Sequence, residues 1–228
     1  MGMLKISLPD GLSHEYASGT TVGEIVRNAY GKRSGAVAAL VDGEERDFSY
    51  ILEQDCDIEP ILGDTEAGRY ILRHSCAHLL AQAVVEIYPD AQPTIGPPIE
   101  NGFYYDFKMD PVGDGDLKKI EKKMQEHIRA NHTLTREEHD NRTLRDMFAG
   151  NPFKIEIMND KIGMDIGSSA YRQGDFVDLC LGPHVPSTSY LRWFKLTGTS
   201  QAYWKGDNSN ESLVRIYGMC FYSKDELR

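Results

Sequence analysis

The stretch from Glu66 to Tyr88 constrains the fold most, because it predicts one long helix with two unlike faces. Its apolar residues recur at the three-and-four spacing of a helix that packs on a core. They are Leu72, Cys76, Leu79, Leu80, Ala83, Val84 and Ile87. The opposite face carries His74 and His78, which lie one helical turn apart and project side by side. Their neighbours on that face are small or apolar: Ala77, Ala81 and Val85. We therefore expect the second face to be covered too, as in a helix that lines a cleft.

A second group of reactive side chains lies far along the chain, between Asp178 and His184. Residues 175–181 predict a strand, so Asp178 and Cys180 should point to the same face. Gly182-Pro183 then predicts a turn that presents His184. A histidine pair alone is more often structural than functional, but a C-x-x-x-H pair beside an H-x-x-x-H pair is much rarer by chance. The two groups together predict one composite site.

Three imidazoles and a thiol allow more than one chemistry. They could fill a tetrahedral zinc site, or three of them could bind zinc and leave a position for water. Without a metal, the same groups could hold and polarise a water molecule. The thiol as a covalent nucleophile would need a lowered pKa. The four residues are His74, His78, Cys180 and His184.

Composition narrows the class of protein. A hydrophobic fraction of 40% is ordinary for a globular chain, and four scattered cysteines are too few for a disulfide framework. No apolar run has the length of a membrane span, and the start of the chain lacks signal-peptide architecture, so a cytoplasmic location is expected. The net charge of −10 argues against unspecific coating of nucleic acid. It still allows a nucleic-acid substrate held by a local basic patch.

The first sixty or so residues predict a small sheet crossed by one helix. Alternating apolar and polar residues, broken by turn residues, indicate hairpins. Thr20 or Thr21 can cap a short helix that ends near Gly31. This order suggests a β-grasp (ubiquitin-like) fold, in which nothing gathers titratable groups. The expected strands cover residues 3–8, 12–16, 36–41, 47–48 and 57–62.

A loop rich in glycine and proline, residues 94–102, precedes an aromatic strand. Gly96 and its neighbours predict a close approach of the backbone to another group. Tyr104 and Tyr105 should point to opposite faces of the strand, so only one can stack on a ligand. An exposed aromatic ring beside such a loop suits a nucleobase or a ribose.

Residues 153–158 alternate in polarity and predict a strand, with Phe153 on the core side and Lys154 on the other. A lysine there normally faces solvent, unless the outer face is the cleft. A helix that begins at Asp114 or Asp116 carries four lysines on its outer face, interrupted by glutamates. This pattern indicates either a solvated surface or a ridge that faces phosphates. A further short helix is expected near residues 141–149.

Five segments together resemble the amino-terminal half of bacterial threonyl-tRNA synthetases. They are residues 73–80 (RHSCAHLL), 95–106 (IGPPIENGFYYD), 178–186 (DLCLGPHVP), 202–207 (AYWKGD) and 215–218 (RIYG). The resemblance covers essentially the whole chain. It implies an α+β protein, with a TGS domain of β-grasp fold at residues 1–63 and a larger tRNA editing domain at residues 64–228. The histidine pair with C-x-x-x-H also resembles alanyl-tRNA editing domains, whereas the segment 95–106 favours the threonyl family.

The resemblance implies hydrolysis of serine wrongly attached to threonine tRNA. A pocket built for threonine also admits serine, since one methylene is worth only about 1–3 kcal/mol of selectivity. The partner is therefore expected to be a tRNA 3′ end that carries serine. The family's synthetic core and anticodon domain would follow Arg228, so the chain is not expected to form threonyl adenylate. ATP and zinc are expected only for that core, and the full-length protein is expected to be a homodimer through those domains.

The resemblance also implies roles for the matching residues. His74 contacts the terminal ribose, Asp178 pairs with the substrate ammonium, and Lys154 positions or polarises the attacking water. The other two imidazoles and the thiol complete the wall around that water, without metal. Tyr105, with Tyr104 as the alternative, stacks on or contacts the ribose. The expected catalytic residues are His74, His78, Lys154, Asp178, Cys180 and His184. The expected substrate-binding residues are Gly96, Tyr104, Tyr105 and Asp178.

Two other functions stay open. The chain could be a non-catalytic module that docks tRNA through its amino-terminal part and its lysine ridge. It could also be a zinc-dependent deacylase of the alanyl type that acts on another tRNA, with His74, His78, Cys180 and His184 as ligands. Leu181 stands where the threonyl family usually has arginine, which removes one cation near the site and would weaken binding of the acceptor stem.

Overall fold

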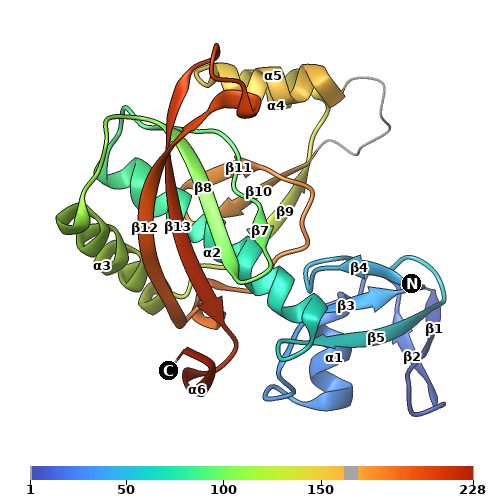
Figure 1. The fold of residues 1–228 in the computed structure, drawn as a ribbon. Helices are drawn as coiled ribbons and strands as arrows, with labels where there is room; N and C mark the ends of the chain where they lie inside the picture. The colour runs from blue at the N-terminus through green and yellow to red at the C-terminus, as the bar shows by residue number, and fades with distance from the viewer. Residues whose placement is uncertain (1, 162–168, 228) are drawn as a thin grey trace.

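The computed structural model describes residues 2–161 and 169–227, which form a mixed α+β fold with several sheets (Figure 1). A long helix, α2 (Glu66–Ile87), leads from an amino-terminal sheet into the space between two further sheets. Within the described ranges, no helix combines the length and the apolar character needed to cross a membrane.

The amino-terminal sheet is mixed, with the strand order β2-β1-β5-β3-β4. Helix α1 (Val22–Tyr30) packs on it and begins with a capping box, in which Thr21 and Glu24 satisfy each other's backbone N–H groups. The strands are β1 (Met3–Ser7), β2 (Ser13–Ala17), β3 (Ala36–Val41), β4 (Glu44–Arg46) and β5 (Cys56–Leu62). The predicted order of strands and helix is confirmed.

One strand of this sheet lies elsewhere than predicted. Asp42 and Gly43 both have positive φ, which is the conformation of a tight two-residue hairpin turn. Strand β4 therefore starts at once, with Glu44 paired to Val41. The predicted strand at residues 47–48 is wrong, and Asp47 instead lies in the chain that leaves the sheet.

Helix α2 is buried around most of its circumference. Thr65 caps it by accepting a hydrogen bond from the backbone of Gly68 at 3.1 Å. His78 is 5% exposed and Ala77 and Ala81 are fully buried, so the prediction that the second face is covered is confirmed. Residues of the amino-terminal sheet pack into the same apolar cluster as α2: Val37, Ala38 and Ile61.

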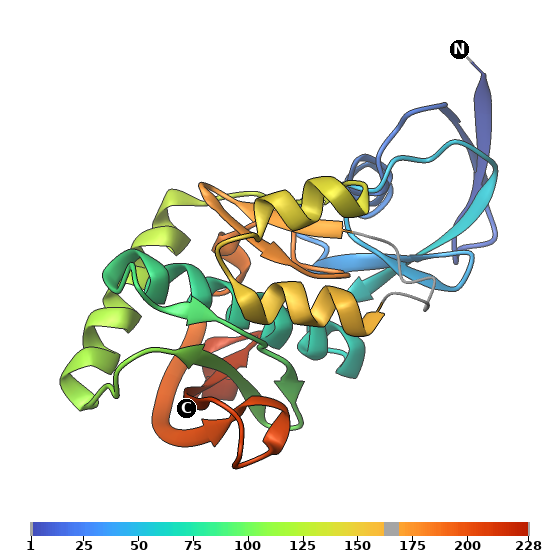
Figure 2. The same cartoon turned by 90° about the horizontal axis from the view of Figure 1, so that it is seen from above.

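Two sheets follow (Figure 2). The larger has the order β12-β13-β8-β6, with β7 also paired to β8, and α2 packs against β8 and β13. Its strands are β6 (Gln92–Pro93), β7 (Pro98–Ile99), β8 (Gly102–Lys108), β12 (Trp193–Tyr203) and β13 (Ser212–Phe221). The smaller sheet, β11-β10-β9, is made of β9 (Leu134–Glu138), β10 (Ser169–Gln173) and β11 (Phe176–Leu179).

The remaining helices lie outside these sheets (Figure 1). Helix α3 packs against α2 and β12. The predictions of a helix from Asp114 and of a short helix near residues 141–149 are confirmed. The helices are α3 (Asp114–Ala130), α4 (Asn141–Met147), α5 (Pro152–Lys161) and α6 (Lys224–Leu227), with 3₁₀ turns η1 (Thr188–Tyr190) and η2 (Trp204–Gly206).

The strand predicted at residues 153–158 is wrong, because this segment belongs to helix α5. Pro152 is the first helical residue, and the Asn151 side chain accepts hydrogen bonds from the backbone N–H groups of Phe153 at 3.1 Å and Lys154 at 3.2 Å. The apolar residues serve two clusters at helical spacing: Phe153 and Ile157 pack with Trp204, while Ile155 and Met158 pack with Leu144 and Phe148. This mixed spacing imitates the alternation of a strand.

Candidate active site

The two predicted groups converge into one cluster of side chains. One ring nitrogen from each of His74, His78 and His184 and the sulfur of Cys180 all lie within 4.8 Å of one another. The Cys180 Sγ is 3.3 Å from the Nε2 of His74 and 3.3 Å from the Nε2 of His184. The His184 ring centroid is 4.3 Å from that of His74 and 4.2 Å from that of His78. The predicted convergence of two residues from α2 and two from the segment after β11 is confirmed.

The hydrogen bonds of Ser75 fix the tautomer of His184. The Ser75 hydroxyl donates its one hydrogen to the carbonyl of Ile71 at 2.8 Å and accepts from the backbone of Val185 at 3.0 Å. Since the hydroxyl has no further hydrogen, the His184 Nδ1, 3.0 Å away, must donate to it. The lone pair of His184 therefore lies on Nε2, which faces the Cys180 thiol. We did not predict this role for Ser75, although its position between His74 and His78 in the sequence indicates a hydroxyl close to the site.

Replacing Ser75 by alanine is expected to lower the free energy of unfolding by about 1–3 kcal/mol. The change leaves the buried Val185 N–H and His184 Nδ1–H without an acceptor. Urea denaturation measures the loss, with Ser209→Ala in an exposed loop as the matched control, expected within about 0.5 kcal/mol of the parent protein. Equal stability of the two variants would contradict the assignment.

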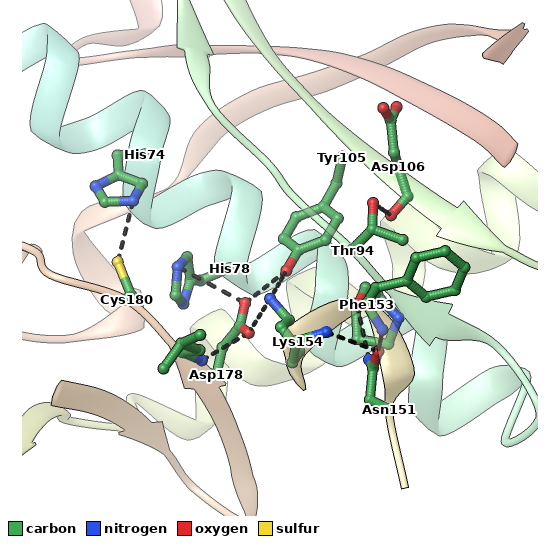
Figure 3. A network of polar contacts seen from close by, with 12 residues as sticks. His74, His78, Thr94, Tyr105, Asp106, Asn151, Phe153, Lys154, Asp178 and Cys180 are labelled. Atoms are coloured by element: carbon green, nitrogen blue, oxygen red, sulfur yellow. Dashed lines mark hydrogen bonds and ion pairs between the residues drawn. The ribbon is translucent and has the colours of Figure 1, made fainter. Parts of the chain in front are cut away.

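A buried ion pair lies directly behind the cluster (Figure 3). The Lys154 Nζ is 2.5 Å from Asp178 Oδ1 and 3.0 Å from the Tyr105 hydroxyl. The Tyr105 hydroxyl donates to Asp178 Oδ2 at 2.6 Å, and the backbone N–H of Leu179 donates to Oδ1 at 2.8 Å. The Nε2 of His78 is 3.9 Å from Asp178 Oδ2, which joins the pair to the cluster. Helix α5 therefore places Lys154 at the site, and the Lys154 side chain is 3% exposed there.

Burial sets the charge of the site. It lowers the pKa of His74 to about 3, with His78 adding to the effect, and it lowers the pKa of His78 to about 4. Burial also lowers the pKa of His184 well below its ordinary value. All three imidazoles are therefore neutral at pH 7. Burial would raise the pKa of Asp178, but the Lys154 ammonium, with His78 and the hydrogen bonds of Lys154 and Tyr105, holds it below its usual value.

The predicted stacking role of Tyr105 is wrong. Its ring is 1% exposed and stacks on Phe107 with centroids 4.9 Å apart. Gly96 lies against the ring so closely that a Cβ there would overlap it, which confirms the predicted close approach of the backbone at Gly96. Tyr105 thus holds Asp178 and Lys154 from behind.

Tyr104 points to the other face of β8, as the alternation predicted. The Arg215 guanidinium carbon lies 3.8 Å from its ring centroid, and Arg215 also binds Asp106 at 2.7 and 2.8 Å. The ring is therefore turned away from the cluster and covered by a cation. Neither tyrosine presents an open ring face to the cluster in this structure.

The chemical types in the cluster could hold a metal ion. One thiol and three imidazoles are ligands that zinc accepts. The donated hydrogen bond from His184 Nδ1 to Ser75 is the kind of outer contact that orients histidine ligands. His74 and Cys180 keep some exposure whereas His78 and His184 are buried, so the cluster is reached from the side of His74 and Cys180.

The sequence of this chain is similar to those of known proteins. Residues 169–217 match the family described as "Threonyl and Alanyl tRNA synthetase second additional domain", and this segment holds Asp178, Cys180 and His184. A threonine–tRNA ligase of Staphylococcus epidermidis is 43% identical over 230 residues, which is 100% of this chain and 36% of that protein. Threonine–tRNA ligase homologues cover the whole chain.

Further threonine–tRNA ligases give the same result. The one from Pelobacter propionicus is 43% identical over 231 residues, 100% of this chain and 36% of its own length. The one from Thermoplasma acidophilum is 48% identical over 190 residues, 83% of this chain and 28% of its own length. These relatives are aminoacyl-tRNA synthetases. The chain spans about a third of the length of the first two.

Proposed function

We propose that this chain is the editing part of a threonine–tRNA ligase and hydrolyses the ester that joins serine to threonine tRNA. The observation that carries the proposal is the cluster of neutral imidazoles around the Cys180 thiol, backed by the Lys154–Asp178 ion pair. Relatives named threonine–tRNA ligase along the whole chain supply the substrate class. The partner is tRNA with serine at its 3′ end, the location is cytoplasmic, and the longer proteins are homodimers.

We also propose how the chain is divided. Residues 1–63 form a TGS domain of β-grasp type, supported by the five-stranded mixed sheet and its single helix. Residues 64–228 form the editing domain, in which α2 lines the substrate cleft. The partial exposure of His74 and Cys180 supports an entrance on that side.

The proposed reaction needs a held water, a proton acceptor and a cation near the developing oxyanion. His74 contacts the hydroxyls of the terminal ribose from the exposed edge of the cluster. Because the imidazoles are neutral at pH 7, the lone pairs that are not engaged can accept a proton from the attacking water. His78, His184 and the Cys180 thiol hold that water against the ester carbon.

Asp178 has a more complex role than a free carboxylate. Both of its oxygens already accept hydrogen bonds, from Lys154, Tyr105 and Leu179. Of the roughly four acceptor positions of the carboxylate, one on Oδ2 is left for an arriving seryl ammonium. We infer that an ammonium bound there shares the negative charge of Asp178 with Lys154, which loosens the contact of Lys154 and lets its ammonium polarise the attacking water.

A zinc-dependent deacylase is the second candidate, favoured by the cluster of possible ligands. A zinc ion held by His74, His78, Cys180 and His184 would act as a Lewis acid on bound water. We favour metal-free hydrolysis, since the threonyl resemblance implies a site without metal. Elemental analysis of undenatured protein decides between them: about one zinc per chain, removed together with activity by a chelator, supports the metal enzyme.

Incubation of the chain with aminoacylated tRNA tests the proposed function. We expect release of serine from seryl-tRNA, retention of threonine on threonyl-tRNA, and loss of serine release in His74→Ala. A 3′-seryl-adenosine ester is assayed in parallel, because it needs no contact with the body of the tRNA. If tRNA binds but neither seryl ester is hydrolysed, the chain is the non-catalytic docking module.

A further inference from the structure

A hydrogen bond joins the segment that follows β4 to the β9-β10-β11 sheet beside the site. The hydroxyl of Tyr171, on β10, donates to the Asp47 carboxylate, which lies 124 residues earlier in the chain. Both side chains are buried, with 6% of Asp47 and 2% of Tyr171 exposed. Burial raises the pKa of Asp47, while the hydrogen bonds from Tyr171 and Ser49 and the charge of Arg136 oppose that rise. Burying a carboxylate costs free energy unless its hydrogen-bond donors stay in position.

The ring of Tyr171 lies directly against the catalytic cluster. Its centroid is 4.4 Å from that of His184, at an interplanar angle of 71°, the edge-to-face arrangement that aromatic rings favour. Gly182 has a φ of +73°, and a Cβ there would overlap the Tyr171 hydroxyl. Tyr171 therefore touches both the His184 ring and the turn that presents it.

A cavity of about 600 Å³ lies beside this hydrogen bond and is lined by both parts of the chain. Tyr50 and Glu53 line it from the amino-terminal part, and Arg136 and Leu181 from the other. Asp47 and Tyr171 also line this cavity, so their hydrogen bond is the polar contact that holds the Tyr171 hydroxyl at its edge.

We propose that Asp47 is a positioning residue for the site: through the Tyr171 hydroxyl it fixes the ring that packs on His184 and on the turn at Gly182. The amino-terminal part of the chain is then a structural part of the reaction centre and not only a spacer or a tRNA-docking unit. The effect on hydrolysis rests on the proposed function, whereas the effect on His184 does not.

Kinetics on the 3′-seryl-adenosine ester give the first test. Asp47→Ala is expected to lower kcat about 10- to 100-fold with little change in KM, because misplacement of a reacting group by about 1 Å costs up to that much. Asp47→Asn keeps an oxygen that accepts from Tyr171 and is expected to recover most of the rate. Tyr171→Phe should lose as much as Asp47→Ala, and the double variant no more than either, since the two changes break one interaction.

Asp55→Ala is the matched control. Asp55 also lies in the amino-terminal part of the chain, where it accepts a hydrogen bond from the backbone of Lys5 at 2.9 Å, but it is exposed and is not among the residues that line the cavity beside Tyr171. It should leave kcat unchanged. A loss in Asp55→Ala equal to that in Asp47→Ala would show a general effect of destabilising the sheet and would overturn the proposal.

A second test needs no activity. In ¹⁵N-histidine spectra, Asp47→Ala should shift or broaden the ring signals of His184, while those of His127 and His132 stay in place. Unchanged His184 signals in Asp47→Ala would overturn the proposal. If the parent protein hydrolyses neither ester but the His184 signals move as expected, the proposed function fails and the positioning role stands.

Discussion

Replacing Lys154 by methionine is expected to lower the free energy of unfolding by about 3–5 kcal/mol and to slow ester hydrolysis at least about 100-fold. The Lys154 ammonium is 2.5 Å from Asp178, and both side chains are almost fully buried. Methionine fills a similar volume but leaves the carboxylate without its counter-charge. Urea denaturation and the seryl-ester assay measure the two effects.

Two further variants separate the causes. Lys154→Met combined with Asp178→Asn removes both charges, so most of the stability should return while hydrolysis stays lost. Lys119→Met removes a lysine that pairs with Asp116 at 3.0 Å on the exposed surface, and it should change stability by less than about 1 kcal/mol. A Lys154→Met protein as stable as the Lys119→Met protein would show that the buried pair does not form.

Acidification is expected to unfold the chain cooperatively between about pH 4 and 5.5, given a typical stability of about 5–15 kcal/mol. In an unfolded chain the pKa of histidine is about 6.5. In the folded chain the pKa is about 3 for His74, about 4 for His78 and well below the ordinary value for His184. Below about pH 6.5 the unfolded state therefore binds more protons, and stability falls as the pH falls. Each histidine contributes up to about 1.4 kcal/mol per pH unit.

The pH window of this effect, and not its sign, separates the histidines from Asp178 as its cause. The lowered pKa of that carboxylate stabilises the fold above about pH 3.8 and is lost only below it, outside the expected window. Circular dichroism against pH, with a chelator present, measures the transition. His74→Gln should move its midpoint to lower pH, whereas His14→Gln on the exposed strand β2 should not. If the parent protein stays fully folded at pH 4, the three buried neutral imidazoles do not destabilise the fold at acidic pH, and the prediction is wrong.

The sequence predicted those features that periodicity or spacing encodes. The helix around His74 and His78 and four of the five strands of the amino-terminal sheet follow from local patterns. The convergence with Cys180 was expected because an H-x-x-x-H pair and a C-x-x-x-H pair rarely occur together by chance. Helix α5 was missed because Phe153 and Ile157 serve one cluster while Ile155 and Met158 serve another, which imitates alternation. Asn151-Pro152, a capping residue followed by a proline at the first helical position, is the sequence signal that indicates a helix starting at residue 152.

Long-range polar contacts could not be predicted in this way. Nothing in the local pattern says that Tyr105 is buried behind Asp178, or that Tyr171 reaches Asp47 across 124 residues. Such pairs depend on how whole sheets are placed. Lys154 was correctly expected to point into the site, although the strand predicted to carry it there was wrong.

The packing of α2 has a consequence for how the chain can be divided. Val37, Ala38 and Ile61 insert into the same apolar cluster as the first turns of that helix. If the backbone is cleaved near Gly63 and the two products separate, each product exposes the apolar side chains that it contributed to this cluster. We therefore expect the two pieces to stay associated or to aggregate after proteolysis, and the intact chain to melt in one calorimetric peak.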